Sequence, residues 1–133
     1  MDSATTAQPV TVGYAPIDQD HDEFVQLLEQ LKNADNGDFP ALFQALFRHT
    51  EHHLEREKQW MAQSGFPAEA EHNGEHQRVL GEFKQFQSRV DKGLIAFGRA
   101  FINDRLPAWF QLHVSTMDSA LAAHLKQCGI NPP

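Results

Sequence analysis

The chain has 133 residues, of which 41% are hydrophobic and 22% are charged, and its formal net charge is −7. This size and composition predict one globular domain that buries roughly two-thirds of its unfolded surface. The acidic balance argues against nucleic acid as a partner, because no basic patch of useful size can be assembled. The apolar runs, such as GLIAFG, are far too short to span a bilayer.

The N-terminal stretch MDSATTAQPVTVG lacks both the basic and the apolar region of a signal peptide, so we expect none. Cys128 is the single cysteine, which excludes an internal disulfide and fits a reducing compartment. We therefore expect a cytoplasmic protein. The chain has eight histidines, a high number for this length, and they are the first indication of chemistry.

Residues 1–16 contain two prolines and a glycine and predict an irregular N-terminal arm, and residues 17–133 are expected to form the domain. From Asp18 the pattern is helical, because apolar residues recur on one helix face together with His21 as far as Leu31. The segment NADNGDFP then ends this helix and begins another.

The second helix is expected to have Asp38 as its N-cap and Pro40 in its first turn. It should end at Gly65, and Pro67 should begin the third helix. The DKG segment at 91–93 marks the next turn, and the last helical segment should run to about Lys126. Within it, Pro107 must either kink the helix or begin its regular part.

The sequence has no alternating strand pattern and no repeat. Four amphipathic helices joined by short connections predict an all-α fold, an antiparallel up-down four-helix bundle preceded by the irregular arm.

Each of the four helices places at least one histidine on its apolar face. His53 and Glu57 are four residues apart and therefore share a helix face. Asp118 follows His113 by five residues, a looser spacing from which a carboxylate can still reach sideways to bridge two ions. The set expected to converge on the interior is His21, His53, Glu57, His72, His76, His113 and Asp118.

Buried polar groups without partners cost several kcal/mol each, and buried carboxylates cost more. Metal ions resolve this cost because they use the lone pairs of all these side chains at once. Five imidazoles and two carboxylates are too many ligands for one ion but suit two. This combination favours Fe, Zn, Cu or Ni over Mg and Ca.

The segments IDQDH, HLEREKQWM, GFPAEAEHNGEH and WFQLHVSTMD resemble the motifs of the hemerythrin family, particularly the single-domain bacteriohemerythrins. The resemblance covers roughly residues 12 to 125 and includes the spacings between motifs. It implies a four-helix bundle that holds a non-heme di-iron centre and binds dioxygen reversibly. No second domain is evident that could receive a signal, and no acid–base residue beyond the ligands is obvious. We therefore expect a carrier or store of dioxygen and not an enzyme.

The resemblance also implies the arrangement of the ligands. His72, His76 and His113 would hold one iron, and His21 and His53 would hold the other. Glu57 and Asp118 would bridge the two irons together with an oxo or hydroxo group. The iron with two histidines would keep an open position, where dioxygen would bind as hydroperoxide.

The sequence departs from the family pattern around the expected dioxygen pocket. Phe110 stands where leucine is usual, Leu54 where phenylalanine is usual, and Val114 where isoleucine is common. The pocket residues carried over by position are Phe24, Leu54, Trp109, Phe110 and Val114, for which simple core packing is the alternative role. His49 occupies a position where tyrosine is frequent and could donate a hydrogen bond to a ligand.

Other functions fit part of the pattern. A di-iron sensor of dioxygen or redox state, or an oxidase or peroxidase-like enzyme, could use the same ligands, with an electron donor or an O2-consuming enzyme as partner. HNGEH fits the His72-x-x-Glu75-His76 motif of inverted zinc peptidases, but that reading leaves five of the converging residues unexplained. A ferritin-like oxidase needs two Glu-x-x-His pairs, and this chain has one, Glu69 to His72. A metal-free binding module is the remaining class.

Overall fold

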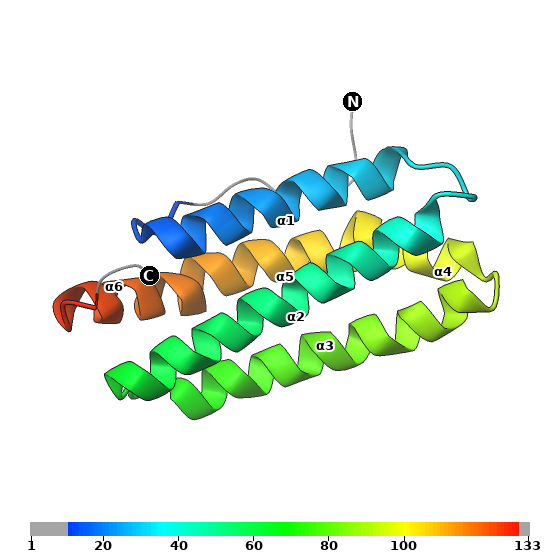
Figure 1. Ribbon diagram of the computed structural model, residues 1–133. Helices are drawn as coiled ribbons and strands as arrows, with labels where there is room; N and C mark the ends of the chain where they lie inside the picture. Colours follow the sequence, from blue (N-terminus) through cyan, green and yellow to red (C-terminus); the bar gives the residue numbers. More distant parts are fainter. Residues whose placement is uncertain (1–10, 131–133) are drawn as a thin grey trace.

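The computed structural model describes residues 11–130, and within them the protein is built from helices with no β-strand (Figure 1). Three long helices are followed by a last segment in which helical elements continue one another directly. The elements are α1 (Ala15–Asn33), α2 (Phe39–Ser64), α3 (Glu69–Asp91), α4 (Ile95–Ala100), the π-helix η1 (Phe101–Arg105), α5 (Leu106–His113), the π-helix η2 (Val114–Asp118) and α6 (Ser119–Gln127). The prediction of an all-α helical bundle is confirmed.

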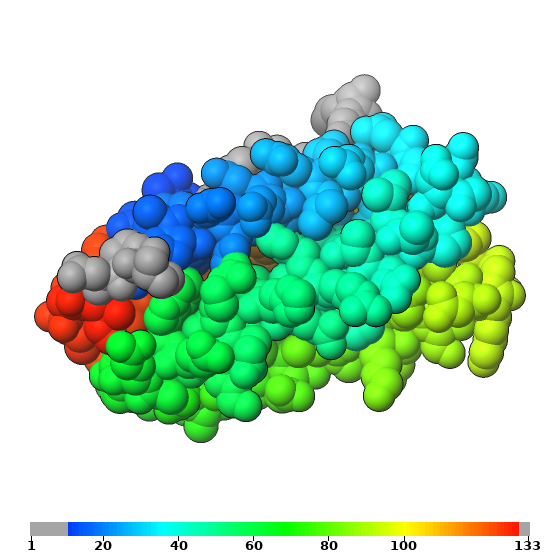
Figure 2. All heavy atoms as spheres, viewed as in Figure 1, coloured from blue at the N-terminus to red at the C-terminus, as the bar shows by residue number. Residues whose placement is uncertain are grey.

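The helices lie lengthwise beside one another, and α2 packs against both α1 and α3. Figure 2 shows that the side chains of α1 and α2 meet along the face in view. No helix in the described part of the chain is both long and apolar enough to cross a membrane.

The first helix begins earlier than predicted. Ala15 and Pro16 belong to α1, so the helix begins three residues before Asp18, where the helical pattern was expected to begin. Proline is favoured in a first helical turn, where its missing N–H would have no partner. Asp18 accepts hydrogen bonds from the backbone N–H groups of Val12 (2.8 Å) and Gly13 (3.2 Å), which attaches the preceding segment to the helix. Residues 1–10 of the predicted arm lie outside the described residues.

The connections between the long helices follow the expected turns with two differences. Asp38 is the N-cap of α2, but its side chain makes no capping bond, and Asp35 instead accepts a hydrogen bond from the Asp38 N–H (2.9 Å). Gly65 ends α2 with φ of +65°, a left-handed conformation that suits glycine. Pro67 lies in a turn, and α3 begins only at Glu69, two residues later than predicted.

Pro107 begins the regular part of the last helical segment, which is one of the two expected outcomes. The π-turn η1 comes directly before α5, and the N–H of Leu106 donates to the carbonyl of Phe101, five residues back. Pro107 then lies in the first turn of α5. The wider π-turn accommodates the proline ring, so helical structure continues through this point. It extends to Gln127, one residue beyond the predicted end.

The core consists of two apolar clusters. The larger cluster includes Phe43, Phe83 and Phe101 and fills the bundle on the side of the α3–α4 turn. The smaller cluster includes Tyr14, Trp60, Met61, Phe66, Leu121 and Leu125. Buried polar residues on each of the long helices and on the last segment separate the two clusters along the chain.

Candidate metal centre

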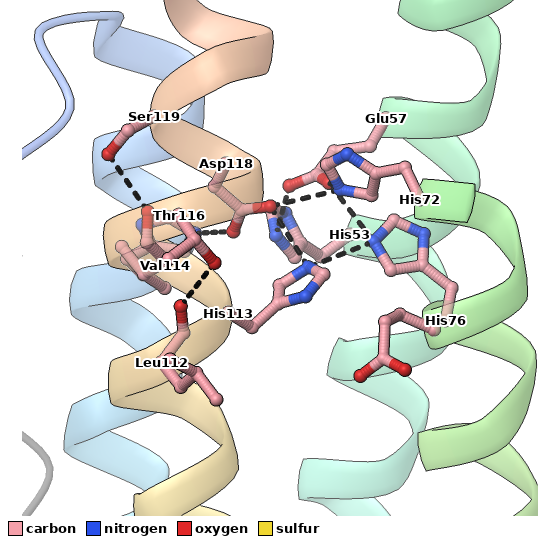
Figure 3. A network of polar contacts seen from close by, with 12 residues as sticks. His53, Glu57, His72, His76, Leu112, His113, Val114, Thr116, Asp118 and Ser119 are labelled. Carbon is pink, nitrogen blue, oxygen red and sulfur yellow. Dashed lines mark hydrogen bonds and ion pairs between the residues drawn. The ribbon is translucent and has the colours of Figure 1, made fainter. Parts of the chain in front are cut away.

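The seven side chains predicted to converge do lie together between the helices. Figure 3 labels six of them, all except His21. All seven are buried, with at most 7% of their surface exposed. Their nitrogen and oxygen atoms form two groups, in each of which all atoms lie within 4.8 Å of one another. One group contains Glu57, His72, His76, His113 and Asp118, and the other contains His21, His53, Glu57 and Asp118.

Each carboxylate belongs to both groups because its two oxygens face different histidines. Glu57 Oε1 lies 3.1 Å from His72 Nε2, while its Oε2 lies 2.7 Å from His53 Nε2. Asp118 Oδ1 lies 3.0 Å from His113 Nε2, while its Oδ2 lies 2.9 Å from His21 Nε2. This is the arrangement that two bridging carboxylates between two cations require.

A π-turn explains how Asp118 reaches the same site as His113. In an α-helix, residues five apart point about 140° away from each other. Here residues 114–118 form η2, whose wider turn brings residues five apart toward the same side of the helix. The hydroxyl of Thr116 donates to the Leu112 carbonyl (2.6 Å), and that of Ser119 donates to the Val114 carbonyl (2.9 Å), which supplies partners where the α-helical ladder is interrupted.

The electrostatics of the site keep both carboxylates ionised. Burial raises the pKa of Glu57, but the positive charge of His53 and the hydrogen bonds that Glu57 accepts hold it well below its usual range. Burial also raises the pKa of Asp118, but the hydrogen bonds from the surrounding histidines outweigh burial. The net result is that the pKa of Asp118 lies below its usual value. Burial lowers the pKa of His53, but the charge of Glu57 and the hydrogen bond with Asp20 outweigh burial and raise it to about 10. The hydrogen bonds of His72 with the two carboxylates likewise raise its pKa to about 9 against the effect of burial. Two buried anions therefore attract cations to this position, and in the metal-free protein these cations are protons on imidazole.

Two carboxylate oxygens show that metal ions fit better than protons alone. Glu57 Oε2 lies 2.7 Å from His53 Nε2 and Asp118 Oδ1 lies 3.0 Å from His113 Nε2, but neither contact has the ideal geometry of a hydrogen bond. His76 Nε2 and His113 Nε2 face each other at 3.3 Å. Lone pairs that point at one another over such distances are satisfied by a cation between them. Five imidazoles and two carboxylates are the ligand types that Fe and Zn accept.

A small cavity of about 10 Å³ lies beside His21 and His53, the side of the site with fewer histidines. This is room for about one small molecule. Its other lining residues are Phe24, Thr50, Leu54, Trp109, Phe110, His113 and Asp118. Val114, expected in this pocket, is buried in the larger apolar cluster and does not line the cavity, because neighbouring residues on a helix point about 100° apart.

Thr50 and Asp20 are the two site residues that sequence reasoning missed. Thr50 lines the cavity and donates its hydroxyl proton to the Leu46 carbonyl (2.8 Å). It lies three residues before His53 on the same helix face, and this spacing is the signal that could have identified it. Asp20 accepts a hydrogen bond from His53 Nδ1 at 2.8 Å. Asp20 directly precedes His21, but acidic residues are often found next to histidines, so this position alone does not identify it as a site residue.

The remaining candidates lie outside the site. His49 donates a hydrogen bond to the backbone carbonyl of Asp20 (3.1 Å), and among the described residues it forms no hydrogen bond or ion pair with the seven clustered side chains. Glu75 accepts hydrogen bonds from Arg78 and from Trp109 Nε1, and the hydrogen bond from Arg78 lowers its pKa to about 2. A carboxylate bound in this way is a poor general base, which disfavours the zinc-peptidase reading. His52 is exposed, as expected.

A helical bundle with a buried set of imidazoles and carboxylates around two cation positions defines a class of metal-binding proteins. A family model described as the hemerythrin HHE cation binding domain matches residues 12–125, so the chain belongs to the hemerythrin family. The chain is 33% identical over 123 residues to a protein named bacteriohemerythrin from Ralstonia nicotianae, covering 92% of this chain and 89% of that protein. No solved structure matches the chain.

Proposed function

We propose that this protein binds dioxygen reversibly at a non-heme di-iron centre and acts as a dioxygen carrier or store. The main observation is that each of two buried carboxylates presents its two oxygens to different histidine groups, beside a small cavity. The hemerythrin family and the name of the Ralstonia relative support iron and dioxygen as ligands. We also propose the antiparallel up-down order of the helices.

The three-histidine group would hold one iron through His72, His76 and His113. The other iron would be held by His21 and His53. Glu57 and Asp118 would bridge the two ions together with an oxo or hydroxo group. When bound, the iron pair supplies an open position for dioxygen and two electrons.

The residues of the chain shape the space for dioxygen and exclude water from it. The rings of Phe24 and Phe110 stack with centroids 4.5 Å apart, and the rings of Phe110 and His21 form a T-shaped pair with centroids 5.4 Å apart. Leu54 closes the cavity from α2, and Trp109 stacks on His113. An apolar enclosure of this kind protects bound dioxygen from protons and from displacement by water.

The cavity favours a carrier over an enzyme. Apart from the proposed ligands, the polar groups that line it are Thr50, whose hydroxyl proton is already donated to a carbonyl, and the indole of Trp109, which donates to Glu75. An oxidase or peroxidase-like enzyme would use an acid or base placed to transfer protons to its substrate. A sensor would use the same site and would differ by a partner that responds to it.

Exposure to dioxygen followed by an argon purge tests the proposal. The metal-free protein is loaded with Fe²⁺ under anaerobic conditions, mixed with air-saturated buffer and then purged while its visible absorption is recorded. A carrier develops a band that disappears on purging and returns with air over repeated cycles. Protein loaded with Zn²⁺ is the control and should stay colourless. Steady dioxygen consumption with release of peroxide would show an enzyme instead.

For the other partners, we propose an electron donor that keeps the irons reduced, or an O2-consuming enzyme that receives the dioxygen. We propose the cytoplasm as the location, since the single cysteine fits a reducing compartment.

A further inference from the structure

Only one of the five clustered histidines has a partner on its far side. The Nδ1 atoms of His21, His72, His76 and His113 have no hydrogen-bond partner among residues 11–130. His53 Nδ1 lies 2.8 Å from Asp20 Oδ2. A carboxylate only accepts, so Nδ1 of His53 carries a proton, and its Nε2 faces the site, where it would bind a metal ion after losing its own proton.

Asp20 is itself held from two sides. Its side chain is buried, and the guanidinium of Arg56 contacts Oδ1 while His53 occupies Oδ2. The backbone of Asp20 is fixed as well, because His49 Nε2 donates to its carbonyl at 3.1 Å. The Arg56 side chain is 45% exposed, so the unit of Asp20 and Arg56 extends from the site to the surface.

We propose that Asp20 is a positioning residue for the metal centre, which fixes the tautomer and orientation of His53 and makes it a stronger ligand than the other four histidines. A carboxylate that accepts the outer N–H of an imidazole increases the electron density on the nitrogen that faces the metal. The effect falls on the ion held by His21 and His53, which is the one beside the cavity. It therefore favours the oxidised state of that ion in particular. This inference rests on the proposed function for the identity of the metal.

Glu23 offers a matched control for Asp20. It lines the same surface groove as Asp20 and Arg56, but its carboxylate lies 4.0 Å from His49 and is half exposed. Glu23→Gln removes a negative charge from this region without touching a proposed ligand.

Zinc binding and nuclear magnetic resonance test the proposal in three variants: Asp20→Asn, Asp20→Ala and Glu23→Gln. Metal-free protein is titrated with Zn²⁺ against a chromophoric chelator. Asp20→Ala should bind one of two zinc ions about 10- to 100-fold more weakly, because loss of such a partner typically has this effect. Asp20→Asn, which keeps an acceptor but loses the charge, should fall between Asp20→Ala and the wild type, and Glu23→Gln should bind like the wild type.

The spectroscopic measurement distinguishes positioning from a general loss of structure. In ¹⁵N spectra of the histidines of the zinc-loaded protein, one Nδ1–H should exchange slowly with solvent, and both Asp20 variants should change that signal alone. In iron-loaded protein, Asp20→Asn should raise the reduction potential of one iron relative to Glu23→Gln. Equal zinc affinity and an unchanged histidine spectrum in Asp20→Ala would overturn the proposal, as would equal weakening of both ions in all three variants.

These outcomes separate the inference from the proposed function. A wild type that binds two zinc or iron ions but no dioxygen would overturn the function, while the Asp20 variants would still decide the role of Asp20. A wild type that binds no metal would overturn both.

Discussion

Phe110→Ala is the change that tests the role of the cavity most directly. Phe110 is 3% exposed, stacks on Phe24 with ring centroids 4.5 Å apart, and forms a T-shaped pair with His21 with ring centroids 5.4 Å apart. Removing the ring enlarges a cavity of about 10 Å³ that has room for about one small molecule. Water can then reach the site, so the oxygenated protein should oxidise several-fold faster than the wild type.

The same change should also lower stability. A Phe to Ala substitution in a core costs about 3–5 kcal/mol. For a domain of this size each kcal/mol lowers Tm by roughly 3–5 °C, so Tm should fall by about 9–25 °C. The two effects must be separated, because a less stable protein could lose dioxygen simply through partial unfolding.

Phe43→Ala is the control that separates them. Phe43 is fully buried among the rings of Phe39, Phe83 and Phe101 and does not line the cavity. It should lower Tm by a similar amount and leave the half-life of the oxygenated protein unchanged, measured from the decay of its absorption band at a temperature where every variant is folded. Phe110→Leu, the usual family residue, should keep most of the wild-type half-life. Equal half-lives for Phe110→Ala and Phe43→Ala would refute the reasoning.

Three further predictions concern the ligands, the packing and the pH dependence. His113→Ala should contain less iron than the wild type by elemental analysis and unfold at a lower temperature, because metal binding contributes to folding; full iron content would contradict its role as a ligand. Gly98→Ala should destabilise the protein by about 1–3 kcal/mol in urea unfolding, because an added Cβ would lie 2.6 Å from Val90 and 2.8 Å from Phe39; an unchanged midpoint would show that these neighbours move freely. The metal-free protein should lose stability as pH rises from about 6.5 through 9 and 10, since the folded-state pKa values of His53 and His72 are raised to about 10 and 9 and their contribution is complete only below the unfolded value of 6.5. Thermal unfolding in EDTA at pH 6 and pH 10 would measure this, and equal Tm values would disprove it.

Helix periodicity was sufficient to predict most of the fold. The recurrence of apolar residues identified three long helices and a last helical segment, and glycine and proline identified the turns between them. The start of α1 was missed by three residues and that of α3 by two, because proline is compatible both with a first helical turn and with the turn before it. The packing that requires Gly98 depends on contacts with Val90 and Phe39, and no local pattern encodes such contacts.

The residues of the candidate centre were predictable, but parts of their geometry were not. Spacings of four residues placed His53 with Glu57 and His72 with His76, as a regular helix requires. The spacing of five between His113 and Asp118 does not suit an α-helix, and it was in fact the signature of the π-turn η2. Asp20 was missed because its contact with His53 joins two helices, and periodicity within one helix cannot report a contact between two.

The position of the ligand-type residues in the core has a consequence for stability. On α1, Ile17 belongs to the smaller apolar cluster and Phe24 to the larger one, and His21 lies between them. The same order of apolar residue, ligand-type residue and apolar residue recurs on α2 and along the last segment. Without metal, a layer of buried charges divides the hydrophobic core, and burial of charge opposes folding. Ions bound to side chains from α1, α2, α3 and the last segment would connect the larger and the smaller apolar cluster. Metal binding should therefore stabilise the whole bundle and not only the residues that hold the metal.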